Sequence, residues 1–194
     1  MNFAATALFA FVASITPGPN NVMLWASGMN HGFRRTIPHL AGVSVGFMSL
    51  LIATALGLGA LFETSPWLSP ALRIGGSAYL VYFAYRIATT AGREQAGDSR
   101  PFTFFQAASF QYVNPKAWVM GITAAATLIP ANQPLVTATL LMTTIFAAVN
   151  LPCIVTWAAA GTAMGRLWDD DGKRRTANWI LALLLLFTIY LINV

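Results

Sequence analysis

Residues 13–22 read Ala13-Ser14-Ile15-Thr16-Pro17-Gly18-Pro19-Asn20-Asn21-Val22, which places two prolines and a glycine in the middle of an apolar segment. Each proline removes a backbone donor and clashes with the preceding helical turn. The residue before a proline is also driven away from α geometry, and here this affects Thr16 and Gly18. The stretch therefore predicts a helix that is broken at its middle.

The composition around this stretch is typical of a membrane protein. The chain has 194 residues, of which 57% are hydrophobic and 9% are charged, and its formal net charge is +5. A soluble domain carries about 25% charged residues, and a small globule needs polar groups to cover its large surface. The composition therefore excludes a soluble monomer, a nucleic-acid binder and a disordered chain. Cys153 is the only cysteine, so no internal disulfide and no cysteine-based metal site is expected.

Six apolar stretches are long enough to cross a bilayer, which takes about 20 residues of helix. They lie at about 2–29, 38–62, 71–91, 106–129, 136–164 and 177–194. We predict an all-α, polytopic transmembrane bundle of six helices that forms one domain over residues 1–194. Because broken backbone inside a membrane is tolerated only where protein buries it or water reaches it, the break in the first helix also predicts a polar interior.

Basic residues gather in three of the loops. Nine of the 11 Lys and Arg residues lie in or beside the loops after the first, third and fifth stretches: Arg34, Arg35, Arg86, Arg93, Arg100, Arg166, Lys173, Arg174 and Arg175. Cytoplasmic loops of membrane proteins carry such an excess. We therefore expect these loops in the cytoplasm and both termini outside it. The acidic residues also lie in loops, so no carboxylate is expected within a span.

The fourth stretch carries a matching interruption. Residues 111–118 read Gln111-Tyr112-Val113-Asn114-Pro115-Lys116-Ala117-Trp118. The chain thus divides into repeat one at about 1–91, a cytoplasmic loop at about 92–105 and repeat two at about 106–194, and each repeat begins with a Pro-interrupted helix. Because each repeat has three spans, the second enters the membrane from the opposite side. Interrupted helices at corresponding positions of inverted repeats mark the midplane site of a transporter.

The two interruptions supply the candidate binding site. The candidate substrate-binding residues are Thr16, Pro17, Gly18, Pro19, Asn20, Asn21, Asn114, Pro115, Lys116 and Asn150. The prolines and the glycine would open the backbone, and the freed amides at the N-termini of half-helices favour a carboxylate. The asparagines would bind the polar ends of a substrate. We expect no catalytic residue and no metal ligand among them.

Lys116 is the only ionisable residue that we place deep within a span. A buried charge is costly and marks a functional hypothesis by default, here pairing with a substrate carboxylate or gating. Two alternatives stay open. The side chain could extend its ammonium to an interface, or it could neutralise backbone carbonyls as a structural strut. A purely structural kink likewise stays open for the proline motifs.

Two motifs together carry a family resemblance. Thr16-Pro17-Gly18-Pro19-Asn20 in the first helix and Asn114-Pro115-Lys116-Ala117 in the fourth resemble the LysE/RhtB-type amino-acid exporters of bacterial inner membranes. Asn20-Asn21, His31-Gly32-Phe33-Arg34 and Leu40-Ala41-Gly42 are most similar to the cysteine/O-acetylserine exporter branch. The resemblance covers essentially the whole chain. It implies a multi-pass inner-membrane carrier that exports small amino acids or their derivatives, driven by the proton gradient and without a cofactor.

The residue that would carry the proton is not evident from the sequence. No Asp or Glu is expected within the spans. His31 and His39 lie near the predicted cytoplasmic mouth and titrate near neutrality, and Lys116 could titrate if desolvation lowers its pKa. Efflux without proton coupling therefore stays open, and the substrate and the proton stoichiometry cannot be read from the residues.

The alternatives to a carrier are a channel, an auxiliary membrane subunit and an intramembrane serine protease. Gly42-Val43-Ser44-Val45-Gly46 matches G-x-S-x-G, but it lies within a predicted helix, whereas the hydrolase motif needs a strand-turn-helix elbow. His39 is also a poor helical neighbour of Ser44. The same residues form a GxxxG stretch for close helix packing, within one chain or in a homo-oligomer. We therefore expect no enzyme, and we expect an amino acid, protons and the lipid bilayer as partners.

Overall fold

Helices make up most of the described chain. The computed structural model describes residues 1–90, 100–168 and 170–193. Its helices are α1 (Phe3–Ile15), α2 (Pro19–His31), α3 (Phe33–Ala55), α4 (Leu61–Thr64), α5 (Leu68–Thr89), α7 (Phe104–Phe110), α8 (Pro115–Leu128), α9 (Leu135–Leu167) and α10 (Asp171–Asn193), with a 3₁₀ turn η1 (Leu58–Ala60). No strand occurs in these ranges, which confirms the all-helical class. Most of the predicted cytoplasmic loop, including Arg93, lies outside the described residues.

The first predicted span is divided into two helices. α1 ends at Ile15 and α2 begins at Pro19, and the backbone between them is extended, with φ −63° and ψ 140° at Thr16 and φ −173° and ψ 175° at Gly18. Pro19 occupies the first helical position, where its missing N–H would have had no intrahelical partner. The break lies where the two prolines predict it.

The fourth predicted span is divided in the same way. α7 ends at Phe110 and α8 begins at Pro115. Asn114 caps α8, because its side-chain oxygen accepts a hydrogen bond from the Lys116 backbone N–H at 3.2 Å. Pro152 has no comparable effect, since α9 continues through it from Leu135 to Leu167.

Two glycines shift the second predicted span toward the N-terminus. We expected it at about 38–62, whereas α3 runs from Phe33 to Ala55. Gly32 precedes the helix with φ +78°, a turn that lets α3 begin directly after α2. Gly57 follows the helix with φ +102° in the left-handed conformation, which ends helices at this position. Both glycines therefore set boundaries that hydrophobicity alone does not indicate.

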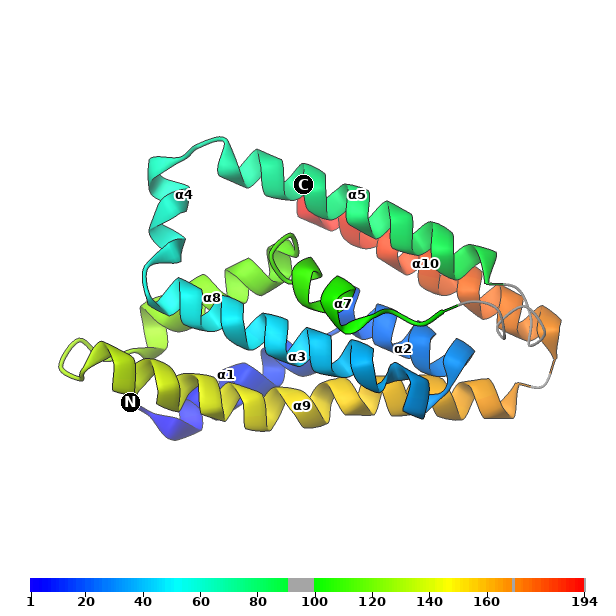
Figure 1. Ribbon diagram of the computed structural model, residues 1–194, viewed down its shortest axis with the longest axis horizontal. Coiled ribbons are helices and arrows are strands. Elements are labelled where there is room, and N and C mark those ends of the chain that lie inside the picture. Colours follow the sequence, from blue (N-terminus) through cyan, green and yellow to red (C-terminus); the bar gives the residue numbers. More distant parts are fainter. Residues whose placement is uncertain (91–99, 169, 194) are drawn as a thin grey trace.

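The long helices run along one direction of the molecule with alternating sense (Figure 1). α2, α5 and α9 end at the same end of the molecule, where α3 and α10 begin. The described basic residues in the first or last turns of these helices, or in the segment before α7, are Arg34, Arg35, Arg86, Arg100, Arg166, Lys173, Arg174 and Arg175. We call this the basic end. The end of α8 and the start of α9 lie at the opposite end (Figure 1).

Glycines bring α9 against α2. A Cβ atom on Gly161 would overlap the backbone carbonyl of Trp25, and one on Gly165 would overlap that of Met29. The same holds for Gly42, which lies against the Phe104 carbonyl of α7. The GxxxG stretch from Gly42 to Gly46 and a second one from Gly161 to Gly165 therefore serve close packing within this chain. The G-x-S-x-G match lies inside the continuous helix α3, without the elbow that a hydrolase needs.

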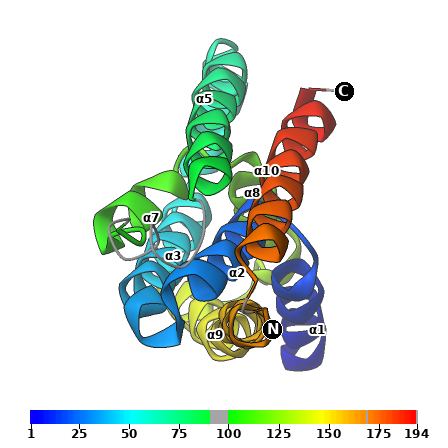
Figure 2. The ribbon, with the colours of Figure 1, turned by 90° about the vertical axis from the view of Figure 1, so that its right-hand side faces the viewer.

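α5 and α10 form a separate pair beside the other helices (Figure 2). Their buried residues, among them Leu80, Phe83 and Leu185, share a core with Val22 and Met23 of α2. Within the described ranges, two helices, α3 and α9, are long and apolar enough to cross a membrane by length and composition, and α1 is a shorter apolar helix. The half-helices α1 and α2, like α7 and α8, reach such a length only when they are taken together.

Candidate functional site

The carbonyl groups at the end of α1 are bound by side chains from other helices. Asn21 of α2 donates from Nδ2 to the carbonyls of Ser14 and Thr16, both at 2.9 Å. Trp157 of α9 donates from Nε1 to the Ile15 carbonyl at 3.2 Å. A helix end leaves its last carbonyls without intrahelical partners. Asn21 and Trp157 therefore satisfy the backbone that the prolines open.

Lys116 reaches the same break from α8. Its Nζ donates to the Thr16 carbonyl and the Thr16 Oγ1, both at 3.0 Å, and to the Pro17 carbonyl at 3.4 Å. Gly18 leaves room for this approach, since a Cβ there would lie 2.9 Å from Cδ and 3.0 Å from Nζ of Lys116. These acceptors are dipoles rather than anions. Lys116 thus makes the contacts of a strut in this conformation, while its charge stays available to an anionic ligand.

A reciprocal pair of amides joins the two interruptions. Asn20 donates from Nδ2 to Gln111 Oε1 at 2.8 Å, and Gln111 donates from Nε2 to Asn20 Oδ1 at 3.1 Å. Gln111 is fully buried and also donates to the Ala107 carbonyl at 2.9 Å. Gln111 is not among the predicted site residues. The signal for it was its place as the first polar residue of the second interruption, opposite the asparagines of the first.

Asn150 lies in α9 beside the break and is 5% exposed. Its Nδ2 donates to Ser14 Oγ at 3.0 Å, whereas its Oδ1 is buried without a hydrogen-bond partner among the described residues. A buried acceptor that lacks a donor costs about 1–3 kcal/mol. The Oδ1 atom therefore indicates an open position for a donor group.

A small cavity lies between the two interruptions. Its volume is about 40 Å³. The predicted site residues that line it are Gly18, Pro19, Asn20, Asn21, Asn114, Lys116 and Asn150. Thr16 and Pro17 contact the site through the hydrogen bonds that their carbonyls accept from Lys116. Pro115 does not line this cavity, and it does not line the larger groove beside α10. The cavity is large enough for water but smaller than an amino acid, so this conformation leaves no room for an amino acid between the two interruptions.

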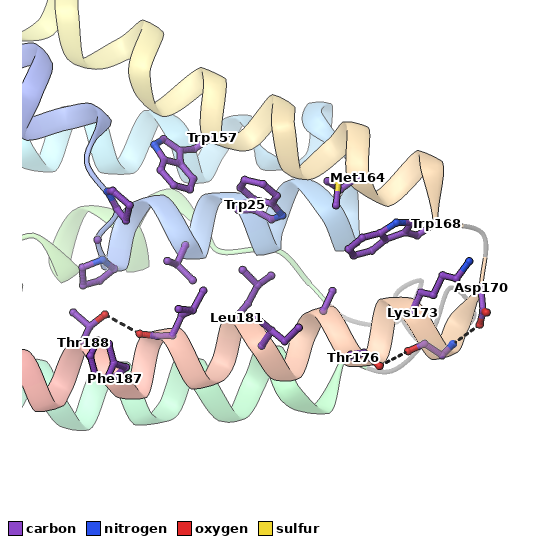
Figure 3. A pocket seen from close by; sticks show the side chains of 18 of the residues that line it. Trp25, Trp157, Met164, Trp168, Asp170, Lys173, Thr176, Leu181, Phe187 and Thr188 are labelled. Atoms are coloured by element: carbon purple, nitrogen blue, oxygen red, sulfur yellow. Dashed lines mark hydrogen bonds between the residues drawn. The ribbon is translucent and has the colours of Figure 1, made fainter.

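A larger groove leads from the break to the basic end (Figure 3). Its volume is about 1050 Å³, and it lies between α2 and α9 on one side and α10 on the other. Gly18, Pro19 and Lys116 line both the groove and the small cavity. The other end of the groove is lined by Asp170 and Lys173. The groove and the small cavity therefore share part of their walls at the break.

The two histidines lie near the basic end but differ in their surroundings. His31 is beyond the first predicted span, and burial, followed by the charges of Arg86 and Arg35, lowers its pKa from 6.5 to about 4. It is therefore neutral at pH 7. His39 is fully buried in α3, with its ring centroid 4.9 Å from that of Phe102, and neither nitrogen has a partner in the described part of the chain. The described residues include no group of three or more His, Cys, Asp or Glu that could hold a metal ion.

The comparisons with known proteins agree on one family. The family described as LysE type translocator matches residues 11–193. The cysteine/O-acetylserine efflux proteins of Escherichia coli strain K12 and Shigella sonnei strain Ss046 are each 31% identical to this chain over 179 residues, which cover 92% of the chain and 91% of the relative. No solved structure matches the chain. The family and these relatives are translocators rather than enzymes, and the chain belongs to the LysE type translocator family.

Proposed function

We propose that the protein is a bacterial inner-membrane carrier that exports small zwitterionic amino acids or their derivatives from the cytoplasm. The observation that carries this proposal is the pair of Lys116 and Asn150 in one polar cavity. Lys116 offers a cation without an anionic partner among its bonds, and Asn150 offers an acceptor without a donor. An α-amino acid presents the complementary carboxylate and ammonium on one carbon. The names of the similar efflux proteins make cysteine and O-acetylserine the first substrates to test.

The carboxylate of the substrate would replace the carbonyl oxygens at Lys116. The bonds from the Lys116 ammonium to these carbonyls are already charge-assisted, but a carboxylate carries a full negative charge where a carbonyl offers only a dipole, so it competes well for the ammonium. The N-terminus of α2 adds the amides of Asn20 and Asn21, which lie in its first turn, where N–H groups have no intrahelical partner. A helix N-terminus favours an anion. Lys116 and α2 would therefore hold the carboxylate together.

Binding would also loosen the break itself. The cavity of about 40 Å³ cannot hold an amino acid, so the walls must move apart. Lys116 now binds the carbonyls of Thr16 and Pro17, and its transfer to a carboxylate would remove these bonds and leave the end of α1 held by Asn21 and Trp157. The ammonium of the substrate would then donate to Asn150 Oδ1. Substrate binding and movement of α1 would thus be coupled through Lys116, as alternating access requires.

We further propose six spans in two inverted repeats, with both termini outside the cytoplasm. The alternating directions of the helices support this arrangement (Figure 1). The bond between Asn20 and Gln111 supports the correspondence of the two interruptions. The concentration of Arg and Lys at the basic end supports the proposal that this end faces the cytoplasm. The groove then opens toward the cytoplasm, as an exporter waiting for substrate requires.

A proton gradient would drive the export. One proton that falls through 100 mV releases about 2.3 kcal/mol, and a tenfold uphill gradient costs about 1.4 kcal/mol. One proton per substrate therefore sustains a gradient somewhat above tenfold. The low pKa of His31 keeps this residue neutral in the physiological range and argues against it as the carrier. A protonophore that abolishes uphill transport but leaves exchange intact would support coupling, whereas an unchanged uphill gradient would contradict it.

Counterflow in proteoliposomes tests the proposed function. Purified protein is reconstituted with unlabelled L-cysteine or O-acetyl-L-serine inside, and uptake of the labelled compound is measured. We expect saturable uptake that depends on the internal substrate. Lys116→Met keeps the length of the side chain but removes its charge, and we expect at least a tenfold loss of transport. Asn132→Ala, in an exposed turn, is the control. Non-saturable flux would favour a channel, and full transport by Lys116→Met would refute the site.

A further inference from the structure

The groove of about 1050 Å³ contains aromatic side chains next to the break (Figure 3). Trp25 of α2 and Trp157 of α9 both line it, and their ring centroids are 5.7 Å apart at an interplanar angle of 58°. Most of the other lining residues are aliphatic or aromatic, and Lys116 lies at the inner end. The groove therefore combines indole rings with a cation at the position where it meets the small cavity.

Trp157 and Lys116 are fixed at neighbouring points of the same backbone. Trp157 Nε1 donates to the Ile15 carbonyl at 3.2 Å, and Lys116 Nζ donates to the Thr16 carbonyl at 3.0 Å. These two carbonyls belong to consecutive residues. The hydrogen bond engages the nitrogen edge of the Trp157 indole and leaves its ring to line the groove. An indole ring and an ammonium group thus lie within the reach of one small zwitterion.

We propose that Trp25 and Trp157 form a second substrate subsite, in which their indole rings bind the ammonium group of an amino acid whose carboxylate faces Lys116. This inference rests on the proposed function. A cation over the face of Trp is attracted by the ring quadrupole, and the attraction grows when the cation is desolvated. The apolar walls of the groove strengthen that attraction because they lower the local dielectric. The substrate would bind here before it passes into the cavity with Asn150.

The charge at the inner end of the groove favours an amino acid over a lipid chain as the occupant. A lipid acyl chain would fit the apolar walls, but its apolar end would meet the Lys116 ammonium and the open carbonyls of the break. A zwitterion complements both ends, with its carboxylate toward Lys116 and its ammonium toward the indoles. The ligand class is therefore a small amino acid with an unblocked ammonium group.

Two analogues of cysteine test separately the binding of the ammonium group and the binding of the carboxylate. Counterflow of labelled L-cysteine is measured under reducing conditions in the presence of 3-mercaptopropionate, which lacks the ammonium, or cysteamine, which lacks the carboxylate. We compare the wild type with Trp25→Phe and Trp25→Leu. Trp179→Leu is the matched control, because Trp179 is 51% exposed on α10 and does not line the groove.

We expect Trp25→Leu to raise the half-saturating concentration of L-cysteine about tenfold, and Trp25→Phe to raise it less, because a benzene ring attracts cations more weakly. Inhibition by cysteamine should weaken in parallel, whereas inhibition by 3-mercaptopropionate should stay unchanged, as should all values for Trp179→Leu. Equal weakening of all three ligands would overturn the ammonium subsite in favour of apolar packing. Unchanged values in both Trp25 variants would overturn it in favour of a groove filled by lipid. Absence of counterflow in the wild type would instead refute the proposed function, on which the subsite depends.

Discussion

Gly18 keeps the path of the Lys116 side chain open, so a single methyl group there tests the site without removing the charge. Gly18 has extended backbone angles that any residue adopts, with φ −173°. A Cβ would lie 2.9 Å from Lys116 Cδ and 3.0 Å from Nζ. Because these atoms belong to a flexible side chain, Gly18→Ala should displace Lys116 while the fold persists. We expect a roughly threefold to tenfold loss of transport, measured by counterflow.

A double-mutant cycle identifies the cause of that loss. If Gly18→Ala acts through Lys116, it should add little to Lys116→Met, because both variants disturb the same contact. Gly75→Ala serves as the control, since a Cβ there would meet only Val113, at 3.9 Å. Fully additive losses would contradict an effect through Lys116.

Substitution of Asn150 distinguishes a role in substrate binding from a role in protein stability. Its Oδ1 is a buried acceptor without a donor among the described residues, and such a group lowers stability. Asn150→Leu removes the atom together with the bond to Ser14 Oγ, so these effects oppose each other. We therefore expect the thermal midpoint of unfolding in detergent to change by only a few degrees. Transport should nevertheless fall by at least tenfold, because the ammonium of the substrate loses its acceptor. A large loss of stability with unchanged transport per folded molecule would mean that Asn150 is only structural.

The sequence predicted which residues lie around the small cavity, but not which hydrogen bonds they make. The two proline interruptions place Asn20, Asn21, Asn114 and Lys116 around one cavity, as expected from their spacing. Asn21, however, directs its Nδ2 to the Ser14 and Thr16 carbonyls. Which side chain binds a freed carbonyl depends on how closely a second helix approaches. That approach is a property of packing and leaves no local pattern in the sequence.

The positions of the helix breaks could be predicted from local backbone chemistry, whereas the ends of α3 could not. The prolines at positions 17, 19 and 115 act on their own backbone, so the breaks between α1 and α2 and between α7 and α8 could be predicted. Gly57 ends α3 through its left-handed conformation. A glycine within an apolar stretch has no such signature until its φ angle is known. The predicted second span was therefore displaced by several residues.

The contact between α2 and α9 depends on Gly161. A Cβ there would overlap the Trp25 carbonyl, and a backbone atom cannot rotate away as a side chain can. Gly161→Ala should separate the helices and destabilise the protein by about 1–3 kcal/mol, the typical cost of overpacking. Thermal unfolding in detergent measures this loss. Ala159→Leu, at an exposed position of the same helix, should leave the midpoint nearly unchanged. Equal midpoints for both variants would show that α9 has room to move away from α2 without cost.

At the scale of the whole molecule, the side of the membrane that the basic end faces decides from which side the groove can receive the proposed substrate. The groove leads from the break to this end, so substrate reaches Lys116 from the cytoplasm only if the basic end faces it. The excess of Arg and Lys predicts that orientation. The separation of the two ends by the length of the long helices makes the prediction accessible to a labelling experiment (Figure 1).

Single cysteines at the two ends test this orientation in sealed membrane vesicles. The native Cys153 is buried, with 4% of its surface exposed, and can be replaced by serine. In that background, Thr176→Cys places a thiol at the mouth of the groove, and Gln133→Cys places one in the exposed turn before α9. A membrane-impermeant thiol reagent should modify Thr176→Cys in inside-out vesicles and Gln133→Cys in right-side-out vesicles. The reverse pattern would place the open groove outside the cell, where it would receive substrate for uptake rather than for export.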